Sequence, residues 1–142
     1  MGAPESWDRV ELTVPSVLDY LSLVNAVSEE FGLQMGADED TRNAINSSVV
    51  EACTNAMEHG NGLDREKRVI LTLRAAPGRF EIDVSDEGEG FDPEEVQDPR
   101  KPENLLRERG RGIFILRNFM DEVRFRIEPS RGTTVHMVKE LK

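Results

Sequence analysis

Residues 51–60 read EACTNAMEHG, and they close a long helix that the apolar pattern predicts from about Asp40 to His59. The run Gly60-Asn61-Gly62 follows at once and is typical of a turn that stops a helix. Within the helix, apolar residues recur at spacings of three and four, so one face is expected in the core. That stripe consists of Ile45, Val49, Ala52, Cys53 and Ala56.

The segment before this helix predicts a strand and a second helix. Residues 9–14 alternate apolar and polar side chains, as a half-buried strand does, and Pro15 ends the alternation. Ser16 is a candidate N-cap for a helix that runs to about Phe31, and Gly32 is its candidate C-terminal stop.

The segment after the long helix predicts more strands and one further helix. Alternation marks strands at about residues 68–75, 80–84, 123–127 and 133–137, and residues 112–120 fit a short helix. Pro77-Gly78 fits a hairpin turn, so the first two of these strands should pair antiparallel. Because helices and strands do not alternate strictly, we predict an α+β fold over residues 1–142. It would be a two-layer sandwich of a mixed, mostly antiparallel sheet with helices on one face.

Composition excludes several classes of protein. The chain has 142 residues, a formal charge of -10 and a single cysteine. An intramolecular disulfide is therefore impossible, and the acidity disfavours nucleic-acid partners and anionic membranes. The first residues lack a signal-peptide pattern, so the expected compartment is the cytoplasm. Cys53 is expected in the core, and His136 has no acid-base partner in view.

Three polar residues share one face of the long helix. Glu51, Asn55 and Glu58 stand at i, i+4 and i+7, away from the apolar stripe. A solvated helix face is the simpler interpretation, but the helix is rich in poor helix formers, which favours a functional surface. An amide oxygen can bind magnesium, and a carboxylate can accept a proton from a nucleophile.

Two glycine motifs follow. Residues 86–90 read DEGEG at the exit of a predicted strand, where glycines let the backbone approach a ligand and Asp86 could accept an exocyclic amine. Gly110-Arg111-Gly112 stands just before the predicted short helix, whose free N–H groups would favour an anion. The alternatives are a plain acidic turn and a hinge with solvated arginines.

Gly132-Thr133-Thr134 enters the last predicted strand, where a hydroxyl could reach a base, although threonine is also an ordinary strand residue. In this order the four motifs resemble those of the GHKL ATPase superfamily, which includes gyrase subunits, histidine kinases and MutL. Residues 51–60, EACTNAMEHG, and 112–123, GIFILRNFMDEV, are most similar to bacterial anti-sigma-factor serine kinases.

The resemblance implies a Bergerat-type ATP-binding fold and a role for each motif. Glu51 would be the general base for the attacking hydroxyl, and Asn55 would bind magnesium. Asp86 would contact the adenine amine, and Thr133 would line the adenine side.

The same resemblance assigns the phosphate side of the site. Gly88 and Gly90 would shape the pocket, residues 92–109 would form an ATP lid, and either Arg107 or Arg109 would sense the terminal phosphate. The residues that would wrap the phosphates are Gly110, Arg111 and Gly112.

The implied cofactors are ATP and Mg2+, and the implied function is that of an anti-sigma regulatory kinase. It would phosphorylate a serine or threonine on an antagonist protein and would sequester a sigma factor; relatives commonly form homodimers. The alternative is a nucleotide-reading binding module without transfer, which residues 98–104 favour because they lack the threonine pair of some members. The catalytic half of a histidine kinase is disfavoured, since no upstream helix with a phosphoacceptor histidine is seen.

Overall fold

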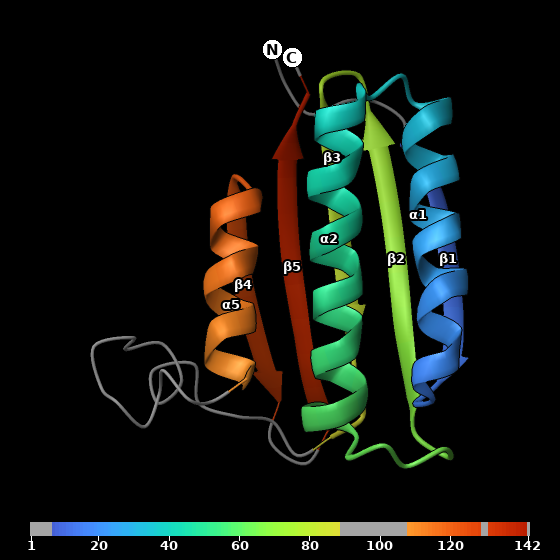
Figure 1. Ribbon diagram of the computed structural model, residues 1–142, viewed down its shortest axis with the longest axis vertical. Coiled ribbons are helices and arrows are strands. Elements are labelled where there is room, and N and C mark those ends of the chain that lie inside the picture. The colour runs from blue at the N-terminus through green and yellow to red at the C-terminus, as the bar shows by residue number, and fades with distance from the viewer. Residues whose placement is uncertain (1–6, 89–107, 129–130, 142) are drawn as a thin grey trace.

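The structure, a computed structural model, describes residues 7–88, 108–128 and 131–141, with side chains from Gly112 onward in the second range. Within these residues one sheet is covered on a single face by helices (Figure 1). Its strands are β1 (Asp8–Pro15), β2 (Arg68–Ala76), β3 (Arg79–Ser85), β4 (Glu122–Glu128) and β5 (Gly132–Glu140). The helices are α1 (Leu21–Gln34), α2 (Glu39–Asn55) and α5 (Glu108–Phe119), with short turns η1 (Leu18–Tyr20) and η2 (Ala56–Gly60). The predicted two-layer α+β sandwich is confirmed.

The strand order is β1-β2-β3-β5-β4, and every pairing among the described strands is antiparallel. Pro77-Gly78 joins β2 to β3 as predicted, and Gly78 has a φ of 80° that favours glycine. Ser85 at the end of β3 pairs with Thr134 near the start of β5. The ends of α2 and β3 therefore lie beside the beginnings of β5 and α5, at the lower end of the molecule in Figure 1.

The first helix begins later than the sequence predicts. Ser16 is not an N-cap: its hydroxyl donates to the Lys67 carbonyl oxygen at 2.7 Å, and the residue is 2% exposed. A single 3-10 turn, η1, then precedes α1 at Leu21. Ser16 therefore joins the end of β1 to the beginning of β2 instead of starting a helix.

The same helix also ends later than predicted. Gly32 lies inside α1, where a Cβ would come 3.1 Å from Cγ of Arg42. The helix continues to Gln34, and Gly36 follows with a φ of 81°. The stop is therefore at Gly36, where the left-handed backbone needs glycine.

The central helix α2 follows the prediction until its last turn. The Asp38 side chain accepts a hydrogen bond from the Thr41 N–H at 2.8 Å and caps the helix. All five residues of the predicted apolar stripe are buried. After Asn55 the chain continues as the π-helical turn η2, in which the Asn61 N–H donates to the Ala56 carbonyl oxygen at 2.8 Å. Such widened turns recur at functional sites.

The core fills the space between the helices and the sheet. Phe80 of β3 is fully buried, and its ring meets that of Phe31 edge-on, with centroids 5.4 Å apart. Cys53 is buried as predicted, and this burial raises the pKa of its thiol to about 12. None of the described helices is long and apolar enough to span a membrane.

A polar cluster joins α1 to α2. The Ser28 hydroxyl donates to Oδ1 of Asn46 at 2.7 Å, and Nδ2 of Asn46 donates to Oε2 of Glu29 at 2.7 Å. Nε of Arg42 donates to Oε1 of Glu29 at 2.6 Å. The hydrogen bonds from Arg42 and then from Asn46 hold the pKa of the Glu29 carboxyl below its ordinary value.

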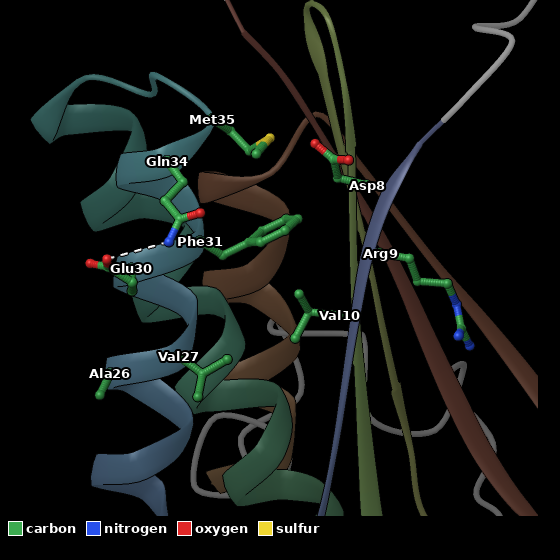
Figure 2. A pocket seen from close by; sticks show the side chains of 9 residues that line it. All are labelled: Asp8, Arg9, Val10, Ala26, Val27, Glu30, Phe31, Gln34 and Met35. Atoms are coloured by element: carbon green, nitrogen blue, oxygen red, sulfur yellow. Dashed lines mark hydrogen bonds between the residues drawn. The ribbon is translucent and has the colours of Figure 1, made fainter.

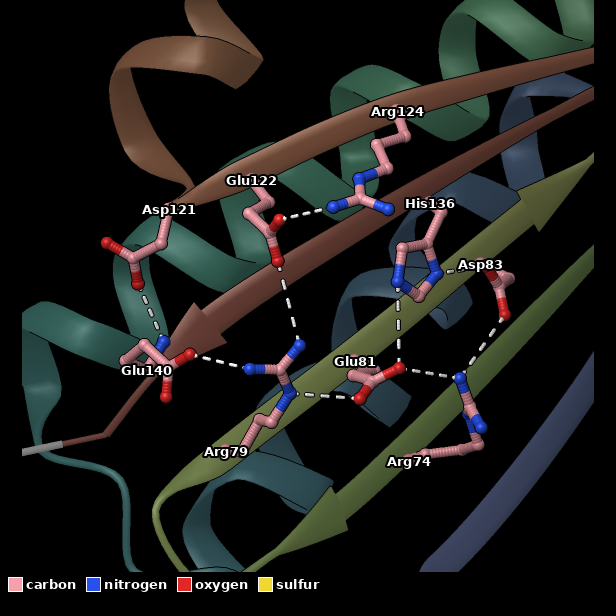
Figure 3. A network of polar contacts seen from close by, with 9 residues as sticks. All are labelled: Arg74, Arg79, Glu81, Asp83, Asp121, Glu122, Arg124, His136 and Glu140. Atoms are coloured by element: carbon pink, nitrogen blue, oxygen red, sulfur yellow. Dashed lines mark hydrogen bonds and ion pairs between the residues drawn. The ribbon is translucent and has the colours of Figure 1, made fainter. Parts of the chain in front are cut away.

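The sheet face away from the helices carries a network of ion pairs (Figure 3). Glu81 binds Nη2 of Arg74 at 2.8 Å and Nε of Arg79 at 3.0 Å. His136, for which the sequence shows no partner, has its Nδ1 atom 2.7 Å from Oδ1 of Asp83. This corrects the sequence interpretation, and the reason is the β3–β5 pairing, which places Asp83 directly opposite His136.

Candidate nucleotide-binding site

Three of the predicted site residues line one small cavity. They are Asn55 at the end of α2, Asp86 just after β3 and Thr133 at the start of β5, and they are 8%, 9% and 3% exposed. The rest of the lining is apolar and consists of Ala52, Ala56, Val84, Ile113, Leu116, Phe125 and Val135. An apolar wall with a few polar side chains is typical of a small-molecule site.

The cavity is tight because α5 forms one of its walls. Ile113 and Leu116 of this helix face the lining residues of α2 and the sheet. The enclosed volume is about 10 Å³, which is room for about one water molecule. A planar base is larger than this volume.

The Asp86 carboxylate is fixed by the backbone on both sides. Its Oδ1 atom accepts hydrogen bonds from the Gly88 N–H at 2.9 Å and from the Thr133 N–H at 3.1 Å. The Asp86 N–H donates to the Thr133 carbonyl oxygen at 3.0 Å. Among the described residues no donor is bonded to Oδ2, so this atom can accept a hydrogen bond from a ligand.

Three glycines allow the backbone to close around Asp86. A Cβ on Gly60 would overlap the Asp86 carboxylate, and one on Gly132 would overlap the Asp86 carbonyl oxygen. A Cβ on Gly88 would overlap the carbonyl oxygen of Gly60. At Gly88 the close approach is to the Gly60 backbone, and the predicted role of Gly88 in shaping a nucleotide pocket stays a prediction.

Gly112 brings α5 against the polar end of α2. A Cβ on Gly112 would overlap the Glu51 carboxylate and would lie 2.8 Å from Nδ2 of Asn55. Glu51 is half-buried and Asn55 is buried at this contact. The predicted base, the predicted magnesium ligand and the second glycine motif are therefore brought together.

The glycine-arginine motif lies differently from the prediction. α5 begins at Glu108 and not at Gly112, so Gly110, Arg111 and Gly112 lie within the helix and not before it. The N–H groups without an acceptor in the helix therefore belong to its first residues, 108–111. They remain at the same end of the sandwich as the cavity (Figure 1).

Part of the predicted site lies outside the described residues. This part is Gly90, Arg107 and the remainder of the predicted lid over residues 92–107. Arg109, the other candidate for sensing the terminal phosphate, falls in the first turn of α5. The choice between the two arginines stays a prediction.

One buried polar residue beside the site is missing from the sequence interpretation. The sequence predicts Asn61 only as part of a turn, yet the residue is 3% exposed and its amide bonds to Ser16, Arg68 and Glu87. These partners are 45, 7 and 26 residues away along the chain. No periodic pattern marks such a residue; its position between two glycines directly after the helix is the one available signal.

Other hollows lie away from this site. A groove of about 630 Å³ runs between α1 and the edge strand β1, and its lining includes Val10, Val27 and Phe31 (Figure 2). No predicted site residue lines it. Among the described residues, no group of three or more histidine, cysteine or acidic side chains could hold a metal ion.

Comparison with known proteins identifies the class to which this fold and site belong. The model of the histidine kinase-like ATPase domain family matches residues 14–139. The chain therefore belongs to this family of ATPase domains.

Individual relatives assign the chain to a smaller group within this family. The chain is 32% identical over 140 residues to the serine-protein kinase RsbW of Bacillus licheniformis, covering 94% of this chain and 86% of that protein. It is 32% identical over 142 residues to the serine-protein kinase RsbW of Staphylococcus epidermidis, covering 95% and 88%. The chain thus belongs with the RsbW serine-protein kinases, and the resemblance read from the motifs is confirmed.

Solved structures agree on the fold. The RsbU and RsbW domains of a Mycobacterium tuberculosis protein align with a TM-score of 0.71 at 20% identity, over 94% of this chain and 32% of that one. The mycobacterial sensor histidine kinase MprB aligns with a TM-score of 0.56 at 19% identity, over 94% and 99%.

Proposed function

We propose that this chain uses ATP and Mg2+ to phosphorylate a serine or threonine on a small antagonist protein. The observation that carries the proposal is the meeting of Asn55, Asp86 and Thr133 at one cavity, with Glu51 and Gly112 in contact beside Asn55. The kinship with the RsbW serine-protein kinases supports the same reaction.

The cavity side would recognise the adenine base. Oδ2 of Asp86 would accept a hydrogen bond from the exocyclic amine, because Oδ1 is already held by two backbone N–H groups. The apolar lining, with Phe125 and Val135, would cover the faces of the ring, and Thr133 would border it. The donors and acceptors thus fit adenine, for which the cavity would have to widen.

The α2 and α5 side would handle the phosphates. When bound, ATP would supply the γ-phosphoryl group, and the magnesium ion would offset the negative charge of the phosphates. The amide oxygen of Asn55 would hold the metal, and N–H groups at the start of α5 would face the phosphates. Glu51 would take the proton of the attacking hydroxyl, so that phosphoryl transfer depends mainly on position and charge.

The proposal extends to two protein partners in the cytoplasm. One is the phosphorylated antagonist, and the other is a sigma factor that the chain would hold away from RNA polymerase. The similarity of residues 51–60 and 112–123 to anti-sigma kinases supports both partners. The net charge of -10 argues against direct contact with nucleic acid. A homodimer is part of the proposal because relatives of this kind commonly form one.

A second candidate function is a module that reads the nucleotide and binds a partner without transfer. Residues 98–104, which lack the threonine pair of some members, favour it. The presence of Glu51 favours the kinase, because a module that only binds needs no base.

The test is a phosphotransfer assay with labelled ATP and a candidate antagonist protein, together with calorimetric measurement of ATP binding. Glu51→Ala is expected to abolish transfer and to keep ATP binding, while Asn55→Ala should weaken binding that depends on magnesium. Glu58→Gln, on the following turn and outside the cavity, is the matched control and should transfer normally. ATP binding without any transfer by the wild type would establish the second function, and full activity of Glu51→Ala would remove Glu51 as the base.

A further inference from the structure

Asn61 ties together three segments near the site. Its Nδ2 atom donates to the Ser16 hydroxyl at 2.8 Å and to the Arg68 carbonyl oxygen at 3.0 Å. Its Oδ1 atom accepts the Glu87 N–H at 2.8 Å. The residue is 3% exposed, so these bonds are shielded from water. Both donor hydrogens and the acceptor of the amide are therefore in use.

Two residues beside these hydrogen bonds adjoin Asp86: one packs against its side chain, and the other follows it in the chain. Gly60, directly before Asn61, lies so close that a Cβ would overlap the Asp86 carboxylate. Glu87, whose N–H is bound by Asn61, directly follows Asp86. The Glu87 carboxylate in turn accepts the Arg68 N–H. Asn61 thus holds both the segment that packs on the carboxylate and the segment that carries it.

We propose that Asn61 is a positioning residue for adenine selectivity, which it controls through Asp86. The inference rests on the proposed function, because it takes the Asp86 carboxylate as the acceptor for the exocyclic amine. Asn61 is not among the residues that line the cavity. It fixes the backbone directly after Asp86 and the Gly60 segment that packs on its carboxylate, so that Oδ2 stays where an amine can donate to it.

This role differs from simple support of the fold. A residue that only stabilises the domain would change the binding of all nucleotides by the same factor. A residue that directs Oδ2 would affect adenine most. Inosine triphosphate carries a carbonyl oxygen where adenine carries the exocyclic amine, so it cannot donate to Asp86 from that position. It is therefore the probe that separates the two roles.

The experiment compares the binding of ATP and of inosine triphosphate by calorimetry, with thermal unfolding measured in parallel. The wild type should prefer ATP by about tenfold to a hundredfold, the effect of one hydrogen bond to a charged acceptor. Asn61→Ala should reduce this preference by about tenfold, because the Glu87 N–H loses its acceptor. If Asn61→Ala does not fold, Asn61→Ser takes its place. The serine side chain is polar but too short to bind the Glu87 N–H, so the same loss of preference is expected.

Ser16→Ala is the matched control. It removes one partner of Asn61 at the far end of the cluster and leaves the bond to Glu87 in place. It should lower the unfolding temperature and keep the preference for ATP. An unchanged ratio of affinities in the Asn61 variants would overturn the role of Asn61 alone. Failure of the wild type to bind ATP would overturn the proposed function and this inference with it.

Discussion

Gly112→Ala tests whether α5 must lie directly on Glu51 for the site to work. The substitution adds one methyl group at a buried position on α5. That methyl would overlap the Glu51 carboxylate and approach Nδ2 of Asn55 to 2.8 Å. Either Glu51 turns away or α5 shifts outward, and both changes disturb the end of α2.

Two opposing effects set the change in unfolding free energy. Alanine is the better helix former by about 1 kcal/mol, which favours the variant. Overpacking a closed contact costs about 1–3 kcal/mol, which opposes it. We therefore expect a net loss of about 0–2 kcal/mol. Phosphotransfer should fall more steeply than ATP binding, because the predicted base is displaced.

The decisive assay is a double-mutant cycle in urea unfolding. Glu51→Ala removes the group that the new methyl would strike, so Gly112→Ala should cost about 1–2 kcal/mol less in that background. If the two substitutions are additive, the contact between Gly112 and Glu51 is not the source of the effect. A Gly112→Ala protein with normal stability and normal transfer would refute the reasoning as a whole.

Other predictions concern the rest of the fold. The lowered pKa of Glu29 means that its contribution to stability is present above the ordinary value of 4.5 and is lost as the pH falls through the lowered folded-state value. Glu29→Gln should therefore flatten the acid limb of urea midpoints measured against pH, and an unchanged limb would contradict this origin. Among the described residues, only Ser48 has a buried side-chain atom without a hydrogen-bond partner, so Ser48→Ala should raise unfolding free energy by about 0–1 kcal/mol in urea titrations. A clear loss of stability there would reveal a partner. Cys53 should resist alkylation at pH 8 in the native protein and react after denaturation, because burial raises its thiol pKa to about 12. Rapid native labelling would contradict its burial.

Local patterns predicted the elements whose structure depends on neighbouring residues in the chain. The spacing of Ile45, Val49 and Ala52 placed α2 because an amphipathic stripe is repeated within one helix. Pro77-Gly78 placed the β2–β3 hairpin because the turn chemistry lies in two residues. Both features could therefore be read without knowledge of the rest of the fold.

Elements that depend on distant partners could not be read in this way. Ser16 has the chemistry of an N-cap, but its hydroxyl is used by Lys67, which is 51 residues away. Gly32 resembles the C-terminal stop of a helix, because no pattern in the neighbouring residues shows that Arg42 packs against it. The motifs named Asp86 and Thr133 separately. Along the chain, α5 and β4 lie between these two residues. Only the pairing of β3 with β5 explains why they share a hydrogen bond.

The three glycines around Asp86 also bear on how this domain can change by mutation. Loops usually tolerate substitution. At Gly60, Gly88 and Gly132, however, the space for a side chain is taken by backbone or by the Asp86 carboxylate. These three positions, at the end of η2, just after β3 and at the start of β5, should therefore be as intolerant of substitution as the core. New ligand preferences are then expected to arise at cavity-lining side chains such as Val135 and not at these glycines.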